Sequence, residues 1–368
     1  MGGAGTYASF LLKGLRNKGV ETYTITTGNR TIRDRSIYRI AIPNITYWRR
    51  LYFSKSSIHL LHELNKIRKF DLVHFNEPHL ITARNPNLPT VCTFHSTQLN
   101  EFRLNLTGSS LRTVENIRDL VVKNPVGHLC DIITGFMSDR IICPYSDLVK
   151  LLKYCYVDKQ KIHIIPNGID PEMFDRVDCE SAFLEKHGLE KGSFVLYIGR
   201  LHSLKGVQYL IKAFQRVKRE HRRLKLVVAG TGDFEPYLKR MALGVRGVLF
   251  VGYVSSLMIK KLLYENCLAV VAPSIYETFP MVVLEAMACS KPVIASNVGG
   301  IRLMIKHGKN GFLVNPKNVE ELELFISKLY DDQNLGMRMG SVGRELVEKK
   351  FTIDRMTEET LKVYESLL

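Results

Sequence analysis

The chain has 368 residues and a mass of 42.0 kDa, more than the ~100–200 residues of an ordinary domain, so we expect two domains. Its 45% hydrophobic and 24% charged residues are typical of globular proteins and exclude wholesale disorder. No run approaches the ~18 apolar residues of a membrane span, and the N-terminus has no signal-peptide pattern. The net charge of +16 favours anionic partners: nucleic acid, acidic lipid or phosphorylated small molecules.

Seven cysteines are scattered along the chain without a Cys-x-x-Cys pair. They are Cys92, Cys130, Cys143, Cys155, Cys179, Cys267 and Cys289. Their odd number and irregular spacing argue against a disulfide framework and against a zinc site. We therefore expect the protein to work in a reducing, cytoplasmic environment.

Short apolar runs alternate with helical patterns along most of the chain. The strands that we expect are 71–75, 90–94, 140–143 and 161–165 in the first half, and 194–198, 224–229, 268–271 and 292–295 in the second. Nearly continuous apolar strands separated by helices predict parallel sheets that are covered on both faces. The predicted fold class is therefore α/β.

A cluster of turn-forming residues at 166–171 predicts the domain boundary. We expect a doubly wound, Rossmann-like domain on each side, spanning residues 1–170 and 171–352, and a helix over 353–368 that packs back on the first domain. Ligands of open parallel sheets bind beyond the carboxyl ends of the strands. Two such domains facing each other would form a cleft there.

The loop after the strand 194–198 carries two permanent cations. Gly199 allows a tight turn, and Arg200 and Lys205 follow it at the strand's carboxyl end. A fork-shaped guanidinium and a point-charge ammonium suit a diphosphate. An isolated Arg and Lys would more simply form a solvated basic loop, but the position at a strand end favours a binding role.

A second polar constellation covers residues 274–289. Glu277 lies in the loop after the strand, and Pro280 suits the first turn of a helix, which places Glu285 inside that helix. Carboxylates accept hydrogen bonds from sugar hydroxyls, and a helix start binds phosphate. Glu277 could instead be a helix-start charge favoured by the dipole, whereas Glu285 is surrounded by apolar residues.

Together these motifs resemble the family 4 retaining glycosyltransferases (glycosyl transferases group 1), which have the GT-B fold. The resemblance rests on Glu-x7-Glu (Glu277 and Glu285), on Gly199-Arg200 with Lys205-Gly206, and on the segments 165–170, 228–232, 250–253, 291–300 and 310–314. These segments cover nearly the whole second half in the order and spacing of the family.

The first half resembles the family more loosely. Gly2 and Gly3 belong to a glycine-rich segment that resembles a loop of the family. In the family this loop approaches the donor diphosphate, and its amides can do so because no side chain blocks them. Thr93-Phe94-His95 resembles the strand-end histidine that contacts the donor sugar. A lone histidine is more often structural, but its place after an apolar strand and in family order favours function.

Three positions depart from the family pattern. The chain starts inside the glycine-rich loop, so either the first strand is missing or Met1 is not the true start. Leu303 stands where the family often has glutamate after Gly299-Gly300. Pro280 replaces a glycine and removes one amide from the start of the helix.

The resemblance implies transfer of a sugar from a nucleotide-diphosphate sugar to an acceptor hydroxyl with retained anomeric configuration. The implied catalytic residues are His95, Arg200, Lys205 and Glu277; the implied substrate-binding residues are Gly2, Gly3, Gly199, Phe279, Met281, Val282 and Glu285. A front-face route needs no protein nucleophile, so these groups would stabilise the charge of the leaving diphosphate. The chain has no Asp-x-Asp, so we expect neither a metal nor another cofactor.

The stretch 47–55 combines the only tryptophan, Trp48, with tyrosines and basic residues. The simpler interpretation is a helix that covers the first sheet with its other face solvated. The functional interpretation is an amphipathic element on an anionic membrane surface. It leads to the hypothesis of a peripheral enzyme on the inner face of the membrane, with a lipid or lipid-linked glycan as acceptor.

Other classes of protein remain as alternatives. A dinucleotide-dependent dehydrogenase would need Gly-x-Gly-x-x-Gly, and the segment 230–232 lacks the third glycine. A nucleic-acid binder would fit the pI of about 9.5, but no recognition motif supports it. A catalytically impaired sugar-nucleotide-binding protein, or a transferase with a soluble small-molecule or polysaccharide acceptor, fits the same motifs.

Overall fold

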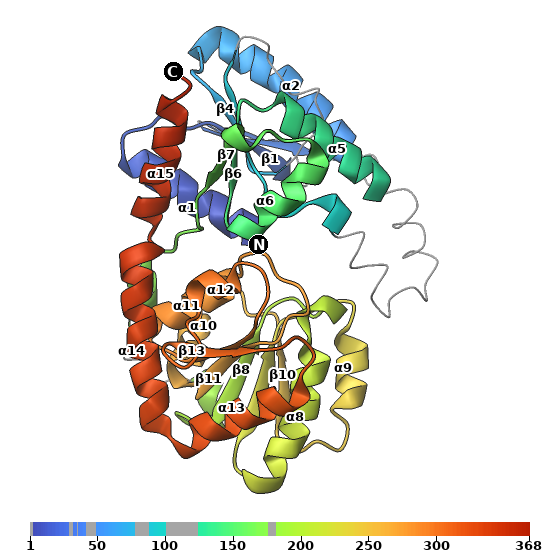
Figure 1. Cartoon of the computed structure of the whole chain (residues 1–368), viewed down its shortest axis with the longest axis vertical. Helices are drawn as coiled ribbons and strands as arrows, with labels where there is room; N and C mark the ends of the chain where they lie inside the picture. The colour runs from blue at the N-terminus through green and yellow to red at the C-terminus, as the bar shows by residue number, and fades with distance from the viewer. Residues whose placement is uncertain are drawn as a thin grey trace. The chain divides into compact units, whose positions relative to one another are not determined.

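The computed structural model describes residues 3–28, 32–34, 36–41, 49–77, 88–100, 124–175 and 182–368. The chain divides into two compact units, Met1–Gly168 with Ile353–Leu368, and Ile169–Thr352 (Figure 1). The polypeptide thus enters the second unit after Gly168 and returns to the first after Thr352. Within the described ranges, no helix is both long enough and apolar enough to cross a membrane.

The described residues of the first unit form two sheets. The smaller has the order β1-β3-β2, and the larger is entirely parallel with the order β4-β5-β6-β7. The strands are β1 (Thr24–Gly28), β2 (Ile32–Asp34), β3 (Ile37–Ala41), β4 (Val73–Phe75), β5 (Thr90–Thr93), β6 (Arg140–Cys143) and β7 (Ile162–Ile164). Among the residues that the structure describes there, the helices of eight or more residues are α1 (Gly3–Asn17), α2 (Arg49–Arg68), α5 (Asn124–Met137) and α15 (Ile353–Glu365). The α/β class with parallel sheets is confirmed.

The C-terminal helix α15 packs against α1 in the core of the first unit. A Cβ atom on Gly14 of α1 would lie 1.9 Å from the Oγ1 of Thr357, so the two helices approach closely at this glycine. Tyr7 and Leu11 of α1 share a buried apolar cluster with Val363 of α15. Both helices thereby cover the larger sheet, whose residues Val91 and Ile142 belong to the same cluster.

The basic aromatic stretch coincides in part with α2. Phe53, Leu60 and Leu64 are buried and form a cluster with Ile40 of β3, so the apolar side of α2 packs on the small sheet. This is the simpler of the two interpretations given above. Trp48 lies outside the described residues.

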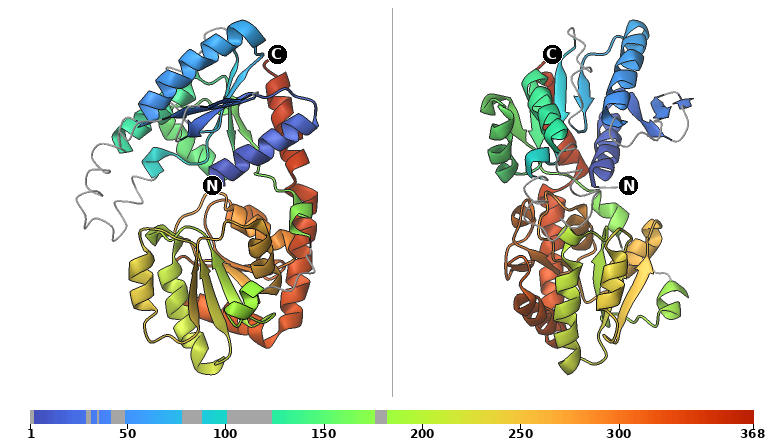
Figure 2. Two further views of the ribbon diagram at one scale, coloured as in Figure 1. Left: turned by 180° about the vertical axis from the view of Figure 1, so that it is seen from behind. Right: turned by 90° about the vertical axis from the view of Figure 1, so that its right-hand side faces the viewer.

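The second unit contains one parallel six-stranded sheet with the order β10-β9-β8-β11-β12-β13. Its strands are β8 (Phe194–Ile198), β9 (Lys225–Ala229), β10 (Val248–Gly252), β11 (Ala269–Ala272), β12 (Val293–Ser296) and β13 (Gly311–Val314). Its helices of eight or more residues are α8 (Val207–Glu220), α10 (Leu257–Asn266), α11 (Met281–Ala288), α13 (Val319–Asp331) and α14 (Gln333–Lys350). They lie on both sides of the sheet (Figure 2), as expected of a doubly wound domain.

The direction of the strand order reverses between β8 and β11. From β8 the chain proceeds outward through β9 and β10, and from β11 it proceeds the other way through β12 and β13. Loops that leave two such strands diverge, which creates the usual ligand position of open α/β sheets. The loops that begin at Gly199 and Pro273 start at this reversal.

Candidate active site

The loops after β8 and β11 pack backbone against backbone. A Cβ atom on Gly206 would lie 1.9 Å from the carbonyl oxygen of Pro273, which is too close for any side chain. Two residues before Gly206 and two residues after Pro273, the amide of Ile275 donates a hydrogen bond of 2.8 Å to the carbonyl of Leu204. The two loops are therefore held at a fixed distance from each other.

Glycines bring two more loops into the same assembly. A Cβ atom on Gly230, after β9, would lie 1.8 Å from the carbonyl oxygen of Gly199. One on Gly299, after β12, would lie 1.9 Å from the carbonyl oxygen of Glu277. Adjacent to it, the amide of Gly300 donates to the carbonyl of Thr278 at 2.6 Å. Four strand-end loops are thus packed together at the carboxyl edge of the sheet.

Lys205 and Glu277 meet at the centre of these loops. The Nζ of Lys205 lies 2.5 Å from the Oε2 of Glu277, and their side chains are 32% and 13% exposed. The carboxylate of Glu277 also accepts from the amide of Thr278 at 3.2 Å and from the hydroxyl of Ser274 at 3.4 Å. The result is an oriented cation–carboxylate pair that solvent can still reach.

Arg200 is placed beside this pair by its backbone, whereas its side chain points to a different partner. The carbonyl of Arg200 accepts a hydrogen bond of 2.8 Å from the hydroxyl of Tyr197. Burial, and secondarily the charge of Glu277, raises the pKa of Tyr197, so that this hydroxyl remains a donor. The guanidinium lies 3.4 Å from Asp233, and both side chains are mostly exposed, so the contact is weak.

Glu285 contacts α10 rather than the lysine–glutamate pair. Its carboxylate is buried and accepts a hydrogen bond of 2.7 Å from the hydroxyl of Tyr264, and Lys260 lies 3.8 Å away. Burial and the neighbouring Glu285 raise the pKa of Tyr264, which keeps its hydroxyl protonated. Of the predicted residues, Lys205 and Glu277 thus contact each other directly, whereas Glu285 has its own partners on α10.

The start of α11 offers backbone rather than side-chain groups. Phe279 is buried, and its ring centroid lies 6.1 Å from that of Phe351. Among the described residues, the amide of Val282 in the first turn has no acceptor, as is usual at helix starts. The amide of Val282 can therefore contribute to ligand binding.

In the first unit, His95 follows β5 as expected and is held from two sides. Its Nε2 lies 3.1 Å from the Oδ1 of Asn76, and the ring of Tyr7 meets its ring edge-on at a centroid distance of 4.8 Å. Burial lowers the pKa of His95 to about 4, so its ring is neutral near pH 7. Of the expected glycine loop, Gly3 instead opens helix α1, and Gly2 lies outside the described residues.

Beneath His95 lies a polar network that the sequence analysis missed. His74 contacts the hydroxyl of Tyr364 through Nδ1 at 2.5 Å and that of Thr93 through Nε2 at 2.7 Å, and Tyr7 reaches the same Thr93 hydroxyl at 3.2 Å. Burial lowers the pKa of His74 to about 3. The signal that could have revealed this network is the occurrence of polar residues in and just after the apolar strand 71–75.

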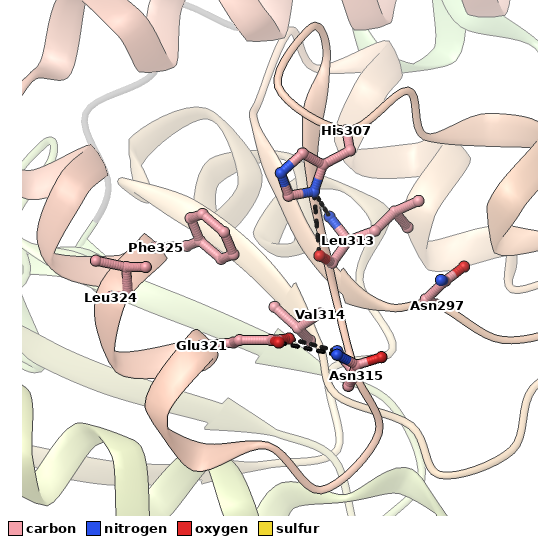
Figure 3. A pocket seen from close by; sticks show the side chains of 8 residues that line it. All are labelled: Asn297, His307, Leu313, Val314, Asn315, Glu321, Leu324 and Phe325. Carbon is pink, nitrogen blue, oxygen red and sulfur yellow. Dashed lines mark hydrogen bonds between the residues drawn. The ribbon is translucent and has the colours of Figure 1, made fainter.

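A pocket in the second unit is lined by residues of β13 and α13 and by Asn297 of the loop after β12. Its lining residues are Asn297, His307, Leu313, Val314, Asn315, Glu321, Leu324 and Phe325 (Figure 3). Glu321 accepts from both the backbone and the side-chain amide of Asn315, and His307 contacts the backbone of Leu313. None of the predicted site residues lines this pocket, so it is not the candidate active site.

The side chains of His128, Asp131 and Cys155 could hold a metal ion within the part of the chain that the structure describes, because their ligand atoms lie within 4.8 Å of one another. Asp131 already accepts a hydrogen bond of 2.6 Å from the amide of Gln98. Asp131 therefore helps to fix the loop after β5, and the group includes no predicted site residue.

Comparisons with known proteins agree with this architecture. An uncharacterized glycosyltransferase of Methanocaldococcus jannaschii is 29% identical over 393 residues, which cover 99% of this chain and 94% of that relative. Sucrose-phosphate synthase from Thermosynechococcus elongatus has a TM-score of 0.81 at 20% identity, over 100% of this chain and 94% of that one. HepE of Anabaena, solved in complex with UDP-glucose, has a TM-score of 0.78 at 18% identity, over 100% and 96% of the two chains.

Two family models divide the chain between them. Residues 1–173 match Glycosyltransferase Family 4, and residues 180–346 match Glycosyl transferases group 1. The two matches account for both units, and the structural matches show the GT-B fold. The chain therefore belongs to the family 4, group 1 glycosyltransferases.

Proposed function

We propose that this glycosyltransferase is a retaining, metal-independent enzyme that moves a sugar from a nucleotide-diphosphate sugar to an acceptor hydroxyl. The observation that carries the proposal is the contact of Lys205 with Glu277 at the carboxyl ends of β8 and β11. Parallel sheets bind ligands at such a reversal of strand order. The complex of the similar HepE protein with UDP-glucose supports a donor of this class.

The donor-binding groups serve different parts of an extended molecule. Lys205 and Arg200 stabilise the negative charge that develops on the leaving diphosphate, together with the amides at the start of α11. Glu277 accepts hydrogen bonds from hydroxyls next to the diphosphate. Glu285, which has its own partners on α10, accepts from hydroxyls on another part of the donor.

The remaining predicted residues approach the donor through backbone or ring atoms. Gly199, with φ of +155°, leaves room for a phosphate beside the turn after β8, and Gly2 and Gly3 have the same role at the start of the chain. His95 contacts the transferred sugar. Its neutral ring at pH 7 suits hydrogen bonding to a hydroxyl, because one nitrogen donates and the other accepts.

Retention follows from a front-face displacement. The bond between the anomeric carbon and the diphosphate oxygen breaks, and the bond to the acceptor oxygen forms on the same face. The acceptor's proton passes to the departing phosphate oxygen, which therefore serves as the base. The protein supplies positioning and charge stabilisation, and no covalent intermediate is needed.

We propose that the acceptor is a lipid or a lipid-linked glycan, with the enzyme bound peripherally to the inner face of the membrane. The support is the outward face of α2, where Tyr52, Lys55 and Lys66 are exposed and suited to anionic headgroups. Sedimentation with vesicles containing anionic phospholipid should be salt-sensitive. Absence of binding at low salt would exclude the membrane part of the proposal and leave the transferase part intact.

The transferase proposal is tested by incubating the protein with UDP-, GDP- and ADP-sugars and measuring donor hydrolysis, then transfer to lipid and soluble acceptors. Proton NMR of the product reports the anomeric configuration. We expect turnover that persists in EDTA and falls on Lys205→Met substitution. Nucleotide-sugar binding without hydrolysis or transfer would instead identify a catalytically impaired binding protein, and an inverted product would exclude the front-face route.

A further inference from the structure

The side chain of Asn76 joins two segments of the first unit that are distant in sequence. Asn76 directly follows β4, and His95 follows the neighbouring strand β5, with Phe75 paired to Cys92 in the parallel register. The Nδ2 of Asn76 donates to the carbonyl of Ala4 in the first turn of α1 at 3.0 Å. Its Oδ1 lies 3.1 Å from the Nε2 of His95.

These two contacts determine which nitrogen of His95 carries the proton. The carbonyl oxygen of Ala4 can only accept, so the amide of Asn76 must present its NH₂ group to it. The oxygen of the same amide then faces His95, and because that oxygen can only accept, the Nε2 of His95 must carry a hydrogen. In the neutral ring the lone pair therefore lies on Nδ1, and none of the described residues hydrogen-bonds to that atom.

The side chains around His95 favour this one tautomer of its neutral ring. The ring of Tyr7 packs edge-on against the imidazole and restricts its rotation. His74 and Tyr7 are titratable side chains next to His95, and both are uncharged at neutral pH. Burial lowers the pKa of His74 to about 3 and raises that of Tyr7 to about 12.

We propose that Asn76 is a positioning residue that fixes His95 in the Nε2–H tautomer, so that its Nδ1 accepts a hydrogen bond from a hydroxyl of the transferred sugar. The contact with the sugar rests on the proposed function, whereas the tautomer does not. The side chain of Asn76 also keeps His95 in register with the first turn of α1 through Ala4. Donor sugars that lack the hydroxyl in question, such as a deoxy analogue, are then poorer substrates.

The tautomer is tested on the full-length protein by ¹⁵N NMR of the imidazoles at pH 7, with His95→Gln used to assign the signals. We expect an Nε2–H ring in the wild type and a mixture of tautomers in Asn76→Ala. Asn266→Ala is the matched control, since Asn266 also donates from its side chain to a backbone carbonyl, that of Leu262 at 2.8 Å. A wild-type ring protonated on Nδ1, or an unchanged ring in Asn76→Ala, would overturn the proposal.

Donor turnover tests the functional part. Asn76→Ala should lower kcat/KM for the donor by roughly 10- to 100-fold, the loss expected for one buried hydrogen-bonded group, and Asn266→Ala should not. Asn76→Asp should raise the pKa of His95, protonate Nδ1 and make activity recover as the pH is raised. A mixed tautomer with unchanged kcat/KM would overturn the sugar contact alone. Absence of donor turnover in the wild-type protein would overturn the proposed function. The NMR measurement would still show whether Asn76 fixes the tautomer of His95.

Discussion

Alanine substitution of Gly206 tests whether loop packing positions the catalytic pair. Gly206 has φ of +72° and Gly244, which lies outside the assembly of strand-end loops, has φ of +82°. Alanine at either position has the same backbone penalty of about 1 kcal/mol. The two sites differ in space: the new Cβ would lie 1.9 Å from the Pro273 carbonyl oxygen at Gly206, and would have nothing within 4 Å at Gly244.

The clash can be relieved only if the two loops separate by more than 1 Å, because Cβ atoms essentially never approach another atom to less than 3.0 Å. Lys205 precedes Gly206 in the chain, and Glu277 belongs to the opposite loop, so the separation acts directly on their contact. A misplacement of about 1 Å can lower turnover by about 100-fold. We expect that loss in kcat/KM for Gly206→Ala and a change within about twofold for Gly244→Ala.

The assay measures donor turnover with the nucleotide sugar that the wild type accepts, alongside thermal unfolding of both variants. The backbone penalty alone should lower the Tm of each by about 2–4 °C. The reasoning would be refuted if Gly206→Ala retained full turnover in a folded protein, or if both variants lost activity to the same extent.

Other predictions address single contacts. Tyr264→Phe removes the donor to buried Glu285 and should destabilise the protein by about 1–3 kcal/mol in chemical denaturation; an unchanged midpoint would contradict this. Lys205→Met should lower kcat by about 100-fold, and a variant with wild-type kcat would exclude Lys205 from charge stabilisation. Burial lowers the pKa of His74 to about 3, against 6.5 for an unperturbed histidine. Between these pH values the unfolded chain binds a proton at His74 that the folded chain does not, so stability should fall as pH decreases from 6.5 toward 3, by up to about 1.4 kcal/mol per pH unit; His74→Gln should reduce that slope. EDTA should leave turnover unchanged, and its abolition with recovery on adding Mg²⁺ would refute metal independence.

Much of the fold could be predicted because the central strands are apolar throughout. The segments 194–198 and 224–229 read as buried strands and form β8 and β9, whose residues are almost entirely inaccessible to solvent. The edge strands β10 and β13 were predicted as family motifs and not as strands, and each is a short run with glycine at one end. The small sheet around β3 was missed because its strands contain charged and polar residues.

The candidate site was predictable in composition and less so in geometry. Sequence position indicates that Lys205 and Glu277 both follow strands of one sheet, and parallel strands end at one edge. It does not indicate where a flexible side chain turns, and Glu285 turns to Tyr264 because a buried carboxylate requires a donor. The sequence analysis placed Gly3 in a loop, whereas it opens α1, because glycine is disfavoured inside helices but tolerated in their first turn.

The glycines of the family pattern therefore have a mechanical role besides their usual one of approaching phosphate. A reversal of strand order makes the loops after β8 and β11 diverge, which leaves an opening that can hold a ligand. Divergence alone does not bring a side chain of one loop into contact with a side chain of the other. Direct contact of Gly206 with the Pro273 carbonyl closes the base of the opening and fixes its width. Lys205 and Glu277, one residue and four residues from those contact points, then meet without any side chain between the loops. A larger residue in place of Gly206 would keep the fold but separate Lys205 from Glu277. The glycine positions and the charged positions therefore belong to one motif.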